Sequence, residues 1–408
     1  MRFLAFQQIR DLDLRLLATV LILGIIGVVM VYSATQTEQP GVSGLWQKQV
    51  LWLILGLISL AIFTALPFRY LHALAWPIYI GSLALLILVL MAPAAANTHR
   101  WFVIGSIQLQ PSEMAKIATV IILARLLSSR EWKRRGWVRI AAAAVLSLLP
   151  MGLVLVEPDL GTSLIFSMIF FSLLYWNQVP LSTLFYLISP LASMLAVVSM
   201  PSWIVFMLIL TAAFRFFKTE FKTAVPLFIM NAAIGSLAPI IWHGLKEYQR
   251  RRIMIFVNPG LDPKGAGWHV LQSKIAIGSG GLLGRGFLQG TQKKLSFLPA
   301  QHTDFIFSTI GEEFGFLGCL IVLLLFAWVI YSGFAIAQRA RNEFAGLTAA
   351  GLTTILLFQV VLNIGMTLGV LPVTGIPLPF LSYGGSSVIT MMSLVGIIMG
   401  IGLRRYEY

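Results

Sequence analysis

Long apolar runs separated by short polar loops make up most of the chain. Most runs are close to the ~20 apolar residues that a helix needs to cross a bilayer. The pattern predicts about 10–12 transmembrane helices, at residues 16–34, 48–66, 73–91, 112–128, 138–156, 161–177, 181–199, 203–217, 225–245, 306–335, 346–370 and 385–403. Pro190 and Pro201 interrupt the apolar pattern between 181 and 217, which makes the two helices there the least regular. We expect an all-α, polytopic integral membrane bundle that forms one domain over residues 1–408.

One long polar stretch, residues 250–304, breaks this alternation. Its glycines and prolines favour turns and close backbone approach over regular structure, and Asp262 lies near its middle. Basic residues are also dense in it: Arg250, Arg251, Arg252, Lys264, Lys274, Arg285, Lys293 and Lys294. We predict that this loop carries the function and that the apolar helices are its frame.

Composition supports the membrane assignment. The chain has 408 residues, of which 58% are hydrophobic and 11% charged, with a mean hydropathy of +0.88. Soluble globular proteins contain about 25% charged residues, so a water-exposed surface cannot be built from this chain. Cys319 is the only cysteine, which excludes an intrachain disulfide. The net charge of +14 indicates cytoplasmic loops and anionic headgroups rather than nucleic acid.

The distribution of lysine and arginine predicts the orientation. Short basic loops, such as 130–139 and 215–222, fall on the same side as both chain ends if there are twelve crossings. That side is therefore expected to be cytoplasmic, and the 250–304 loop extracytoplasmic. A basic loop on the outer side departs from the usual distribution. Two explanations stay open: attraction to anionic headgroups, or a groove for a phosphate-bearing ligand.

Further polar residues are expected on the same outer side. Glu113 and Lys116 open the fourth helix at spacing i, i+3 and can pair, with Ser112 as a possible N-cap. Ionisable residues within a membrane span are costly, so they indicate a functional site. The remaining outer groups are Arg100, the turn of residues 157–162 with Asp159, the pair Glu312 and Glu313, and the proline-broken segment 372–387. We expect these groups to line one outward-facing cavity.

Signatures of soluble enzymes are absent from the sequence. It contains no P-loop, no GxSxG motif and no HExxH motif, and its five histidines lack metal-ligand spacing. The sequence indicates no metal ligands and no certain cofactor. A dependence on a divalent cation, Mg²⁺ or Mn²⁺, stays open.

Six sequence blocks resemble one known family. In chain order they are QPSEMAK, EPDLGTS, NPGLDPKGAGWH, QSKIAIGSGG, GTQKKLSFLPAQHTDFIF and GIPLPFLSYGGSS. Together they are similar to the SEDS family of bacterial cell-wall polymerases, and more to its rod-shape branch than to its cell-division branch. The resemblance covers most of the chain from Arg100 onward.

The resemblance implies an activity, a location and a partner. Members of the family polymerise lipid II, an undecaprenyl-pyrophosphoryl disaccharide-pentapeptide, on the outer face of the bacterial cytoplasmic membrane. They are inverting glycosyltransferases that work with a class B penicillin-binding protein, which cross-links the peptides. Asp262 is then the expected catalytic carboxylate. The expected substrate-binding residues are Arg100, Glu113, Lys116, Asp159, Lys264, Lys274, Arg285, His302, Asp304, Ser382 and Ser386.

Two other functions remain compatible with the residues. A lipid II flippase or transporter would need a polar path through both leaflets, and a non-catalytic scaffold for a cell-wall synthase would not need Asp262. The family usually has ten spans, and this chain is expected to carry about two more between Leu181 and Lys222.

The predicted topology can be tested by cysteine labelling in a Cys319→Ala background. We expect single cysteines at both termini and within 130–139 to react with a membrane-impermeant reagent only from the cytoplasmic side. A cysteine at position 262 should react from the outside, because the loop follows an odd number of crossings. Labelling of position 262 only from the cytoplasm would reverse the whole orientation.

Overall fold

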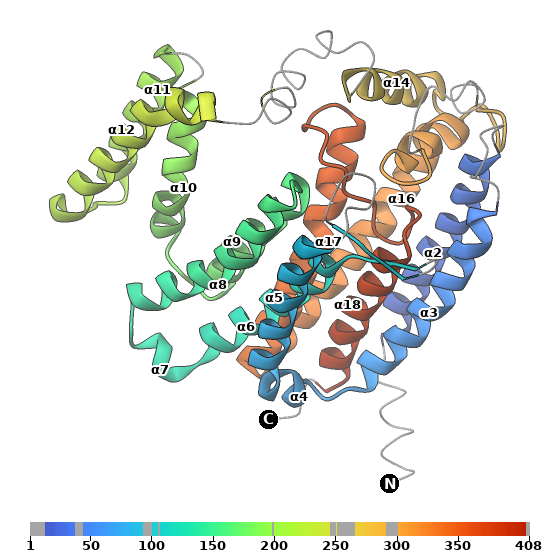
Figure 1. The fold of residues 1–408 in the computed structure, drawn as a ribbon, viewed down its shortest axis with the longest axis horizontal. Helices are drawn as coiled ribbons and strands as arrows, with labels where there is room; N and C mark the ends of the chain where they lie inside the picture. Colours follow the sequence, from blue (N-terminus) through green and yellow to red (C-terminus); the bar gives the residue numbers. More distant parts are fainter. Residues whose placement is uncertain are drawn as a thin grey trace. The chain divides into compact units, whose positions relative to one another are not determined.

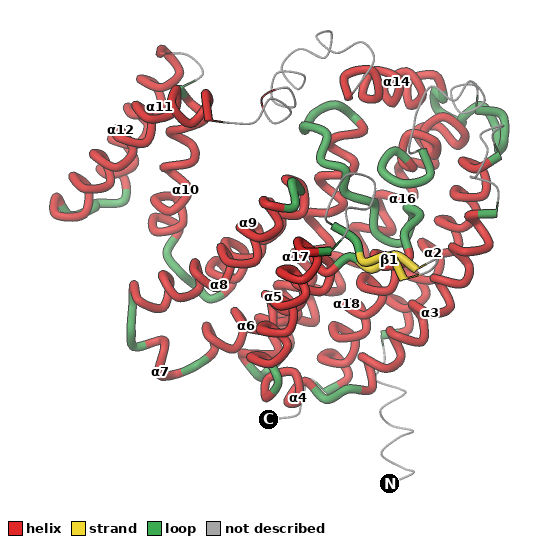
Figure 2. Tube along the Cα trace, viewed as in Figure 1, coloured by secondary structure: helices red, strands yellow, loops and turns green. Residues whose placement is uncertain are grey.

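The computed structural model describes residues 13–36, 44–92, 100–104, 107–197, 200–244, 250, 266–290 and 301–404. Nearly all regular structure in these residues is helical, and the exception is a two-stranded hairpin, β1 (Phe102–Ile104) with β2 (Ile107–Leu109) (Figure 2). The helices before the hairpin are α2 (Leu14–Thr35), α3 (Leu45–Ala65), α4 (Phe68–Ala73) and α5 (Ala75–Met91). Those up to the long loop are α6 (Pro111–Ser128), α7 (Arg130–Lys133), α8 (Trp137–Val156), α9 (Leu160–Trp176), α10 (Leu181–Ala196), α11 (Met200–Phe216) and α12 (Phe221–Gly244). The last are α14 (Ala266–Ser279), α16 (Ile306–Arg339), α17 (Glu343–Thr367) and α18 (Gly385–Leu403).

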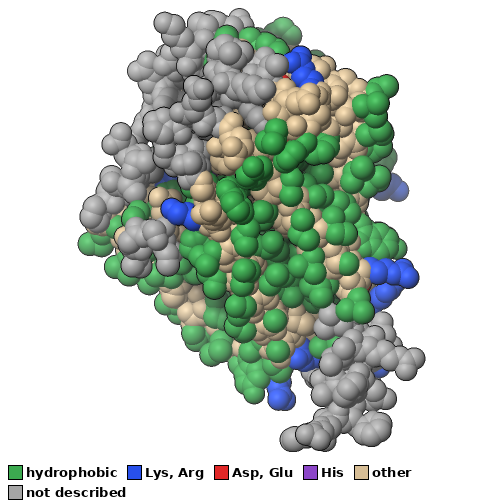
Figure 3. Space-filling view, turned by 90° about the vertical axis from the view of Figure 1, so that its right-hand side faces the viewer, with side chains coloured by type: hydrophobic (Ala, Val, Ile, Leu, Met, Phe, Trp, Pro, Cys, Tyr) green, Lys and Arg blue, Asp and Glu red, His purple; other side chains and the backbone are tan. Residues whose placement is uncertain are grey.

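Each predicted membrane span corresponds to a helix, which confirms an all-α, multi-pass membrane protein. Within the described residues, six helices are long and apolar enough to cross a membrane, and five shorter apolar helices accompany them. Helix α6 is less apolar because it carries Glu113, Lys116 and Arg125. The face in Figure 3 is covered mainly by hydrophobic side chains, as expected where lipid replaces water.

The chain divides into two compact units. Unit 1 comprises Met1–Leu173 and Ile255–Tyr408, and unit 2 comprises Leu174–Met254. Unit 2 contains α10, α11 and α12, so helices form where the additional spans were predicted. Its core packs Tyr186 against Met207 and Leu210. Asn231 donates from Nδ2 to Ser189 Oγ at 3.0 Å, which satisfies buried polar groups between two of its helices.

Helices α17 and α18 form the centre of unit 1 (Figure 1). In their most apolar stretches 83% and 78% of the residues are buried, against 22% in α3. Small residues allow this close packing: a Cβ on Gly56 of α3 would lie 2.9 Å from the Met392 side chain of α18. Small interfacial residues of this kind are typical of membrane helices, whose backbones can then approach closely.

Helix α16 is kinked at Gly315, where φ is 65° and ψ is −159°. The kink frees backbone groups that membrane burial requires to be paired. The turn that follows α14 pairs them: Arg285 N donates to Glu312 O at 3.0 Å, and Phe316 N donates to Gly281 O at 2.9 Å. This backbone pairing fixes the 280–286 turn against the kink.

The kink generates a test with a matched control. Gly281 and Gly284 both have positive φ, but a Cβ on Gly284 would overlap the Glu313 carbonyl whereas one on Gly281 meets open space. Gly281→Ala should destabilise the folded protein by about 1–2 kcal/mol, because alanine disfavours the left-handed backbone conformation at this position. Gly284→Ala should cost about 1–3 kcal/mol more through the overlap. Thermal unfolding of the purified protein in detergent measures both, and equal unfolding midpoints for the two variants would contradict the packing.

Candidate functional site

Two of the sequence-predicted residues, Asp262 and Lys264, lie outside the described residues. The role of Asp262 therefore stays a prediction. The other predicted residues are described, and most of them lie near the ends of α2, α6, α8, α9, α16, α17 and α18 that were predicted to face outward. We call this the outer end of unit 1.

Arg100 holds the turn that joins α8 to α9. It donates from Nε to the Glu157 carbonyl at 2.8 Å and from Nη2 to the Pro158 carbonyl. Its Nη1 lies 3.9 Å from Asp159 Oδ2. Asp159 also caps α9, because its carboxylate accepts from Thr162 N at 3.1 Å and from Thr162 Oγ1 at 2.9 Å. One arginine therefore fixes both the backbone and the charge of this turn.

Asp304 joins this cluster from the segment before α16. Its burial raises the pKa of the carboxyl to about 6, with the negative charge of Asp159 adding to the rise and Arg100 opposing it. The three side chains are thus within electrostatic reach of one another. Asp304 can exchange a proton near neutral pH, a property expected at sites of proton transfer.

Glu157 is the residue at this turn that the site prediction omitted. Its side chain is fully buried, and among the described residues neither carboxylate oxygen has a hydrogen-bond partner. Burial first, and then the charge of Asp159, raise its pKa to about 8, against the opposing effect of Arg100. The only signal in the sequence was its position two residues before Asp159.

Glu113 and Lys116 form the predicted ion pair. Lys116 Nζ lies 2.8 Å from Glu113 Oε1, and both side chains are almost completely buried. The prediction that Ser112 caps α6 was wrong. Gln110 is the N-cap and Pro111 occupies the first turn, where its missing N–H leaves no donor unsatisfied. Ser112 is buried instead, and its hydroxyl has no partner within the described part of the chain.

Gln359 of α17 adds to the unpaired polar groups near this ion pair. Helices α6 and α17 meet where Val120 packs against Gly351. Ser112 and Gln359 each lie eight residues further toward the outer end, or about 12 Å along each helix. Both polar atoms of the fully buried Gln359 side chain lack a hydrogen-bond partner in the part of the chain that the structure describes. Unpaired buried groups at one level are a place for ordered water or a polar ligand.

Glu312 and Glu313, just before the α16 kink, are also buried. Glu313 Oε1 accepts a hydrogen bond from Ser33 Oγ of α2 at 2.5 Å. Glu312 approaches Gly290, where a Cβ would lie 2.8 Å from Oε2. The Ser33 contact was not predicted, because a single serine near the end of an apolar run carries no distinctive signal.

The segment of residues 371–384 connects these groups. Ser382 Oγ donates to Thr303 O at 2.6 Å and accepts from Leu378 N at 2.8 Å. Ser386 Oγ, at the start of α18, accepts from Gln110 N at 3.2 Å. Ser382 and Ser386 therefore tie the segment to residues 301–304 and to α6.

His302 lies against the same segment. Its carbonyl accepts from Tyr383 N at 2.8 Å, and its ring meets the Tyr383 ring edge-on at 5.9 Å. Burial lowers the pKa of the imidazole, which favours the neutral form.

Lys274 and Arg285 are exposed side chains of α14 and its following turn. The Lys274 chain runs past Gly369, where only a glycine leaves it room. Arg285 donates from Nε to Ser279 O at 3.2 Å. Both remain accessible to a ligand outside unit 1. Within the described residues no group of three or more His, Cys, Asp or Glu side chains is arranged to hold a metal ion.

Comparisons with known proteins agree across nearly the whole chain. The family model FTSW_RODA_SPOVE, described as cell cycle protein, matches residues 13–218 and 202–407. The two matches overlap inside unit 2, where additional spans were predicted.

Curated relatives and solved structures give the same picture. The chain is 37% identical to peptidoglycan glycosyltransferase MrdB of Escherichia coli, over 97% of this chain and 94% of the relative. It is 34% identical to peptidoglycan glycosyltransferase RodA of Treponema pallidum, over 98% and 99%. A chain from a structure on polymerization and crosslinking by a peptidoglycan synthase complex matches with TM-score 0.72 and 32% identity, covering 97% of this chain and 99% of that one. The crystal structure of the Thermus thermophilus rod shape determining protein RodA matches with TM-score 0.62 and 28% identity, over 97% and 98%.

Glu157 gives a pH-dependent test of the buried cluster. Its folded pKa of about 8 exceeds the ordinary value, so its contribution to stability is full below about pH 4.5 and is lost as the pH rises through about 8. As the pH is raised from about 4.5 to about 8, the unfolding temperature of the parent protein should decrease. The unfolding temperature of Glu157→Gln should decrease less, because glutamine cannot ionise. Thermal unfolding in detergent across the range measures this. The exposed Glu131→Gln serves as control, and identical pH profiles for all three proteins would contradict the assignment.

Proposed function

Because this chain belongs to the FtsW, RodA and SpoVE family of cell cycle proteins, we propose that it is a peptidoglycan glycosyltransferase that polymerises lipid II into glycan strands for cell elongation. The observation that carries the proposal is similarity over nearly the full length to curated peptidoglycan glycosyltransferases. The buried ionic groups at the outer end support it, because such groups in a membrane protein indicate a site that binds or transforms a charged substrate.

The reaction joins two lipid-linked sugars. A base removes the proton from the acceptor sugar hydroxyl, whose oxygen attacks the anomeric carbon of the donor. The bond from that carbon to the pyrophosphate oxygen breaks, and the lipid pyrophosphate leaves with the electron pair without needing a proton. Attack from the opposite face inverts the configuration, from an α-linked phosphate to a β-1,4 bond. The protein must therefore supply one base and fixed positive charge.

We assign the base to Asp262, in the glycine- and proline-rich stretch where a substrate can approach the backbone. Lys264, Lys274 and Arg285 are assigned to the pyrophosphate, and the side chains of the last two are exposed. A divalent cation bound with the substrate, Mg²⁺ or Mn²⁺, would share the pyrophosphate charge with these side chains.

The buried groups are assigned to substrate positioning. Arg100, Asp159 and Asp304 form one electrostatic unit, and Glu113 with Lys116 forms another. His302, Ser382 and Ser386 hold the 371–384 segment that lies between them. Preorganised groups of this kind cost little reorganisation when the substrate binds.

A lipid transporter is the second candidate, and the distribution of buried charge argues against it. In the described residues the buried Asp and Glu side chains are Glu113, Glu157, Asp159, Glu312 and Glu313. All belong to the outer end. Arg404 is the buried charge at the opposite end, and its guanidinium donates to the carbonyls of Thr64 and Ala65 at the end of α3. A transport path would need polar groups through both halves of the bilayer.

The proposed setting is the bacterial cytoplasmic membrane, with the site on the outer face. A class B penicillin-binding protein is the proposed partner, in keeping with the similarity to a chain of a complex for polymerization and crosslinking. The partner would cross-link the peptides of the new glycan strand. The lipid tails of the substrate would enter between the membrane helices.

The function is tested by glycan polymerisation from purified lipid II by the reconstituted protein. Asp262→Asn keeps the side-chain shape but removes the base, so polymerisation should fall by at least about 100-fold. Asp262→Glu should recover little, because the carboxylate is displaced by one methylene. Unfolding midpoint and binding of the cross-linking partner are the controls, and both should match the parent. A folded Asp262→Asn protein with near-parental polymerisation would exclude Asp262 as the base. Absence of polymerisation by the parent protein, with or without its partner, would favour the scaffold function.

A further inference from the structure

A basic pocket lies at the inner end of unit 1, remote from the candidate active site. It has a volume of about 480 Å³ and lies between α4, the junction of α6 and α7, and the start of α17. Helices α6 and α17 both run from this pocket to the outer end, where Glu113 and Asn363 lie. The pocket therefore opens at the opposite boundary of the membrane-spanning bundle.

The lining of this pocket is strongly cationic. Arg69, Arg130 and Arg341 contribute from three different elements. The one carboxylate in the lining, Glu343, is already bound to Lys133, whose Nζ lies 2.5 Å from Glu343 Oε2. His72 adds no charge near neutral pH, because burial and the neighbouring Arg125 lower its pKa. By formal charge the lining carries three arginines against one carboxylate, which is an excess of positive charge.

The pocket also has an apolar base and fixed walls. Phe68 and Phe344 are buried, and the His72 ring meets the Phe344 ring edge-on at 4.8 Å. Arg125 Nη1 donates to the carbonyls of His72 at 2.8 Å and Ala73 at 3.2 Å, which ties α4 to α6. Cationic walls above aromatic side chains suit a ligand with a charged head and a hydrocarbon tail.

We propose that this pocket binds the phosphodiester headgroup of an anionic phospholipid of the inner leaflet. Guanidinium groups are suited to phosphate oxygens through paired hydrogen bonds. Basic pockets between membrane helices on the cytoplasmic side are the usual sites for anionic headgroups. The position beside the end of α6 and the start of α17 allows the acyl chains to remain in the bilayer while the headgroup enters the pocket.

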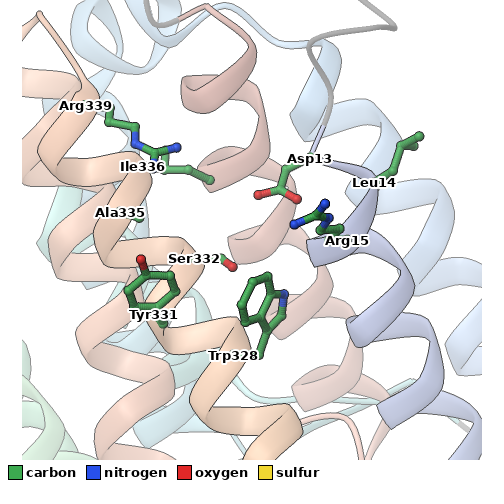
Figure 4. Close-up of a pocket in the computed structure, with 9 residues that line it drawn as sticks. All are labelled: Asp13, Leu14, Arg15, Trp328, Tyr331, Ser332, Ala335, Ile336 and Arg339. Carbon is green, nitrogen blue, oxygen red and sulfur yellow. The ribbon is translucent and has the colours of Figure 1, made fainter.

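A second pocket at the same end has the same volume but a less positive lining, so it is the weaker candidate for an anionic ligand. Its volume is also about 480 Å³, and its lining includes Asp13, Arg15 and Arg339. In Figure 4 the Asp13 carboxylate and the Arg15 guanidinium point toward each other from the start of α2. Asp13 Oδ1 also accepts from Leu16 N at 3.0 Å, so the carboxylate is held in place as a helix cap. Each pocket has one acid in its lining, but this one has two arginines where the first has three, so its smaller positive charge should attract an anion less strongly.

Native mass spectrometry of the full-length protein in detergent tests the proposal. Phosphatidylglycerol and phosphatidylcholine with identical acyl chains are titrated separately, and the parent should bind phosphatidylglycerol more tightly. Each removed arginine should weaken this binding about fivefold, and Arg69→Gln with Arg130→Gln together about 25-fold. Binding of phosphatidylcholine should not change. Equal affinity of the parent for both lipids would overturn the proposal without any variant.

Arg134→Gln is the matched control for Arg130→Gln, because it removes the same charge from the same loop but does not line the pocket. It should change binding less than twofold, and a loss equal to that of Arg130→Gln would reduce the effect to net charge. If the glutamine variants fail to fold, the double variant Arg69→Lys with Arg130→Lys can be used instead. It keeps both positive charges and should retain the preference for phosphatidylglycerol. Competition with inorganic phosphate distinguishes a site for a free anion from a site for a lipid. Displacement of bound phosphatidylglycerol by millimolar phosphate would overturn the lipid assignment.

Discussion

The fold depends on hydrogen bonds to the backbone groups of one non-helical segment inside a membrane protein. Residues 371–384 approach α2 at Gly27, where a Cβ would overlap the Phe380 carbonyl. Gly27 lies eight residues before the end of α2, which corresponds to about 12 Å of helix. Hydrocarbon offers no hydrogen bonds, so the segment can persist only if protein groups pair it. Asn363 Nδ2 donates to the carbonyls of Asp304 and Ile376, and Gln49 Nε2 donates to that of Ser382.

The same pairing assembles the acidic cluster. Asn363 holds the Asp304 backbone next to the segment, and a Cβ on Gly161 of α9 would lie 2.7 Å from the Thr374 carbonyl. These contacts bring Asp304 and Asp159, the N-cap of α9, within electrostatic reach of Arg100. Burial, and then the charge of Asp159, raise the pKa values of the Glu157 and Asp304 carboxyls, and Arg100 only partly opposes the rise. The raised pKa values of Glu157 and Asp304 favour their neutral forms, which lowers the repulsion between neighbouring carboxyls.

The two ends of unit 1 differ in the sign of their available charge. Buried carboxylates gather at the outer end, and basic residues line pockets and loops at the inner end. This asymmetry supports the proposal of substrate positioning at one end and of headgroup binding at the other. It also explains why a large positive net charge is compatible with an acidic candidate site: the positive charge lies mostly in exposed side chains.

Sequence alone determined the features that arise within one segment. Apolar runs in a membrane must pair their backbone groups internally, so a helix forms at each predicted span. The Glu113–Lys116 pair followed from helical spacing, whereas the Ser112 cap failed because Pro111 begins the helix. Tertiary structure decided the rest. Ser33 bonds to Glu313 across 280 residues, and Arg100 bonds to Glu157 across 57. Such contacts depend on how helices pack and on which backbone groups a membrane leaves unpaired, and neither is written in local periodicity.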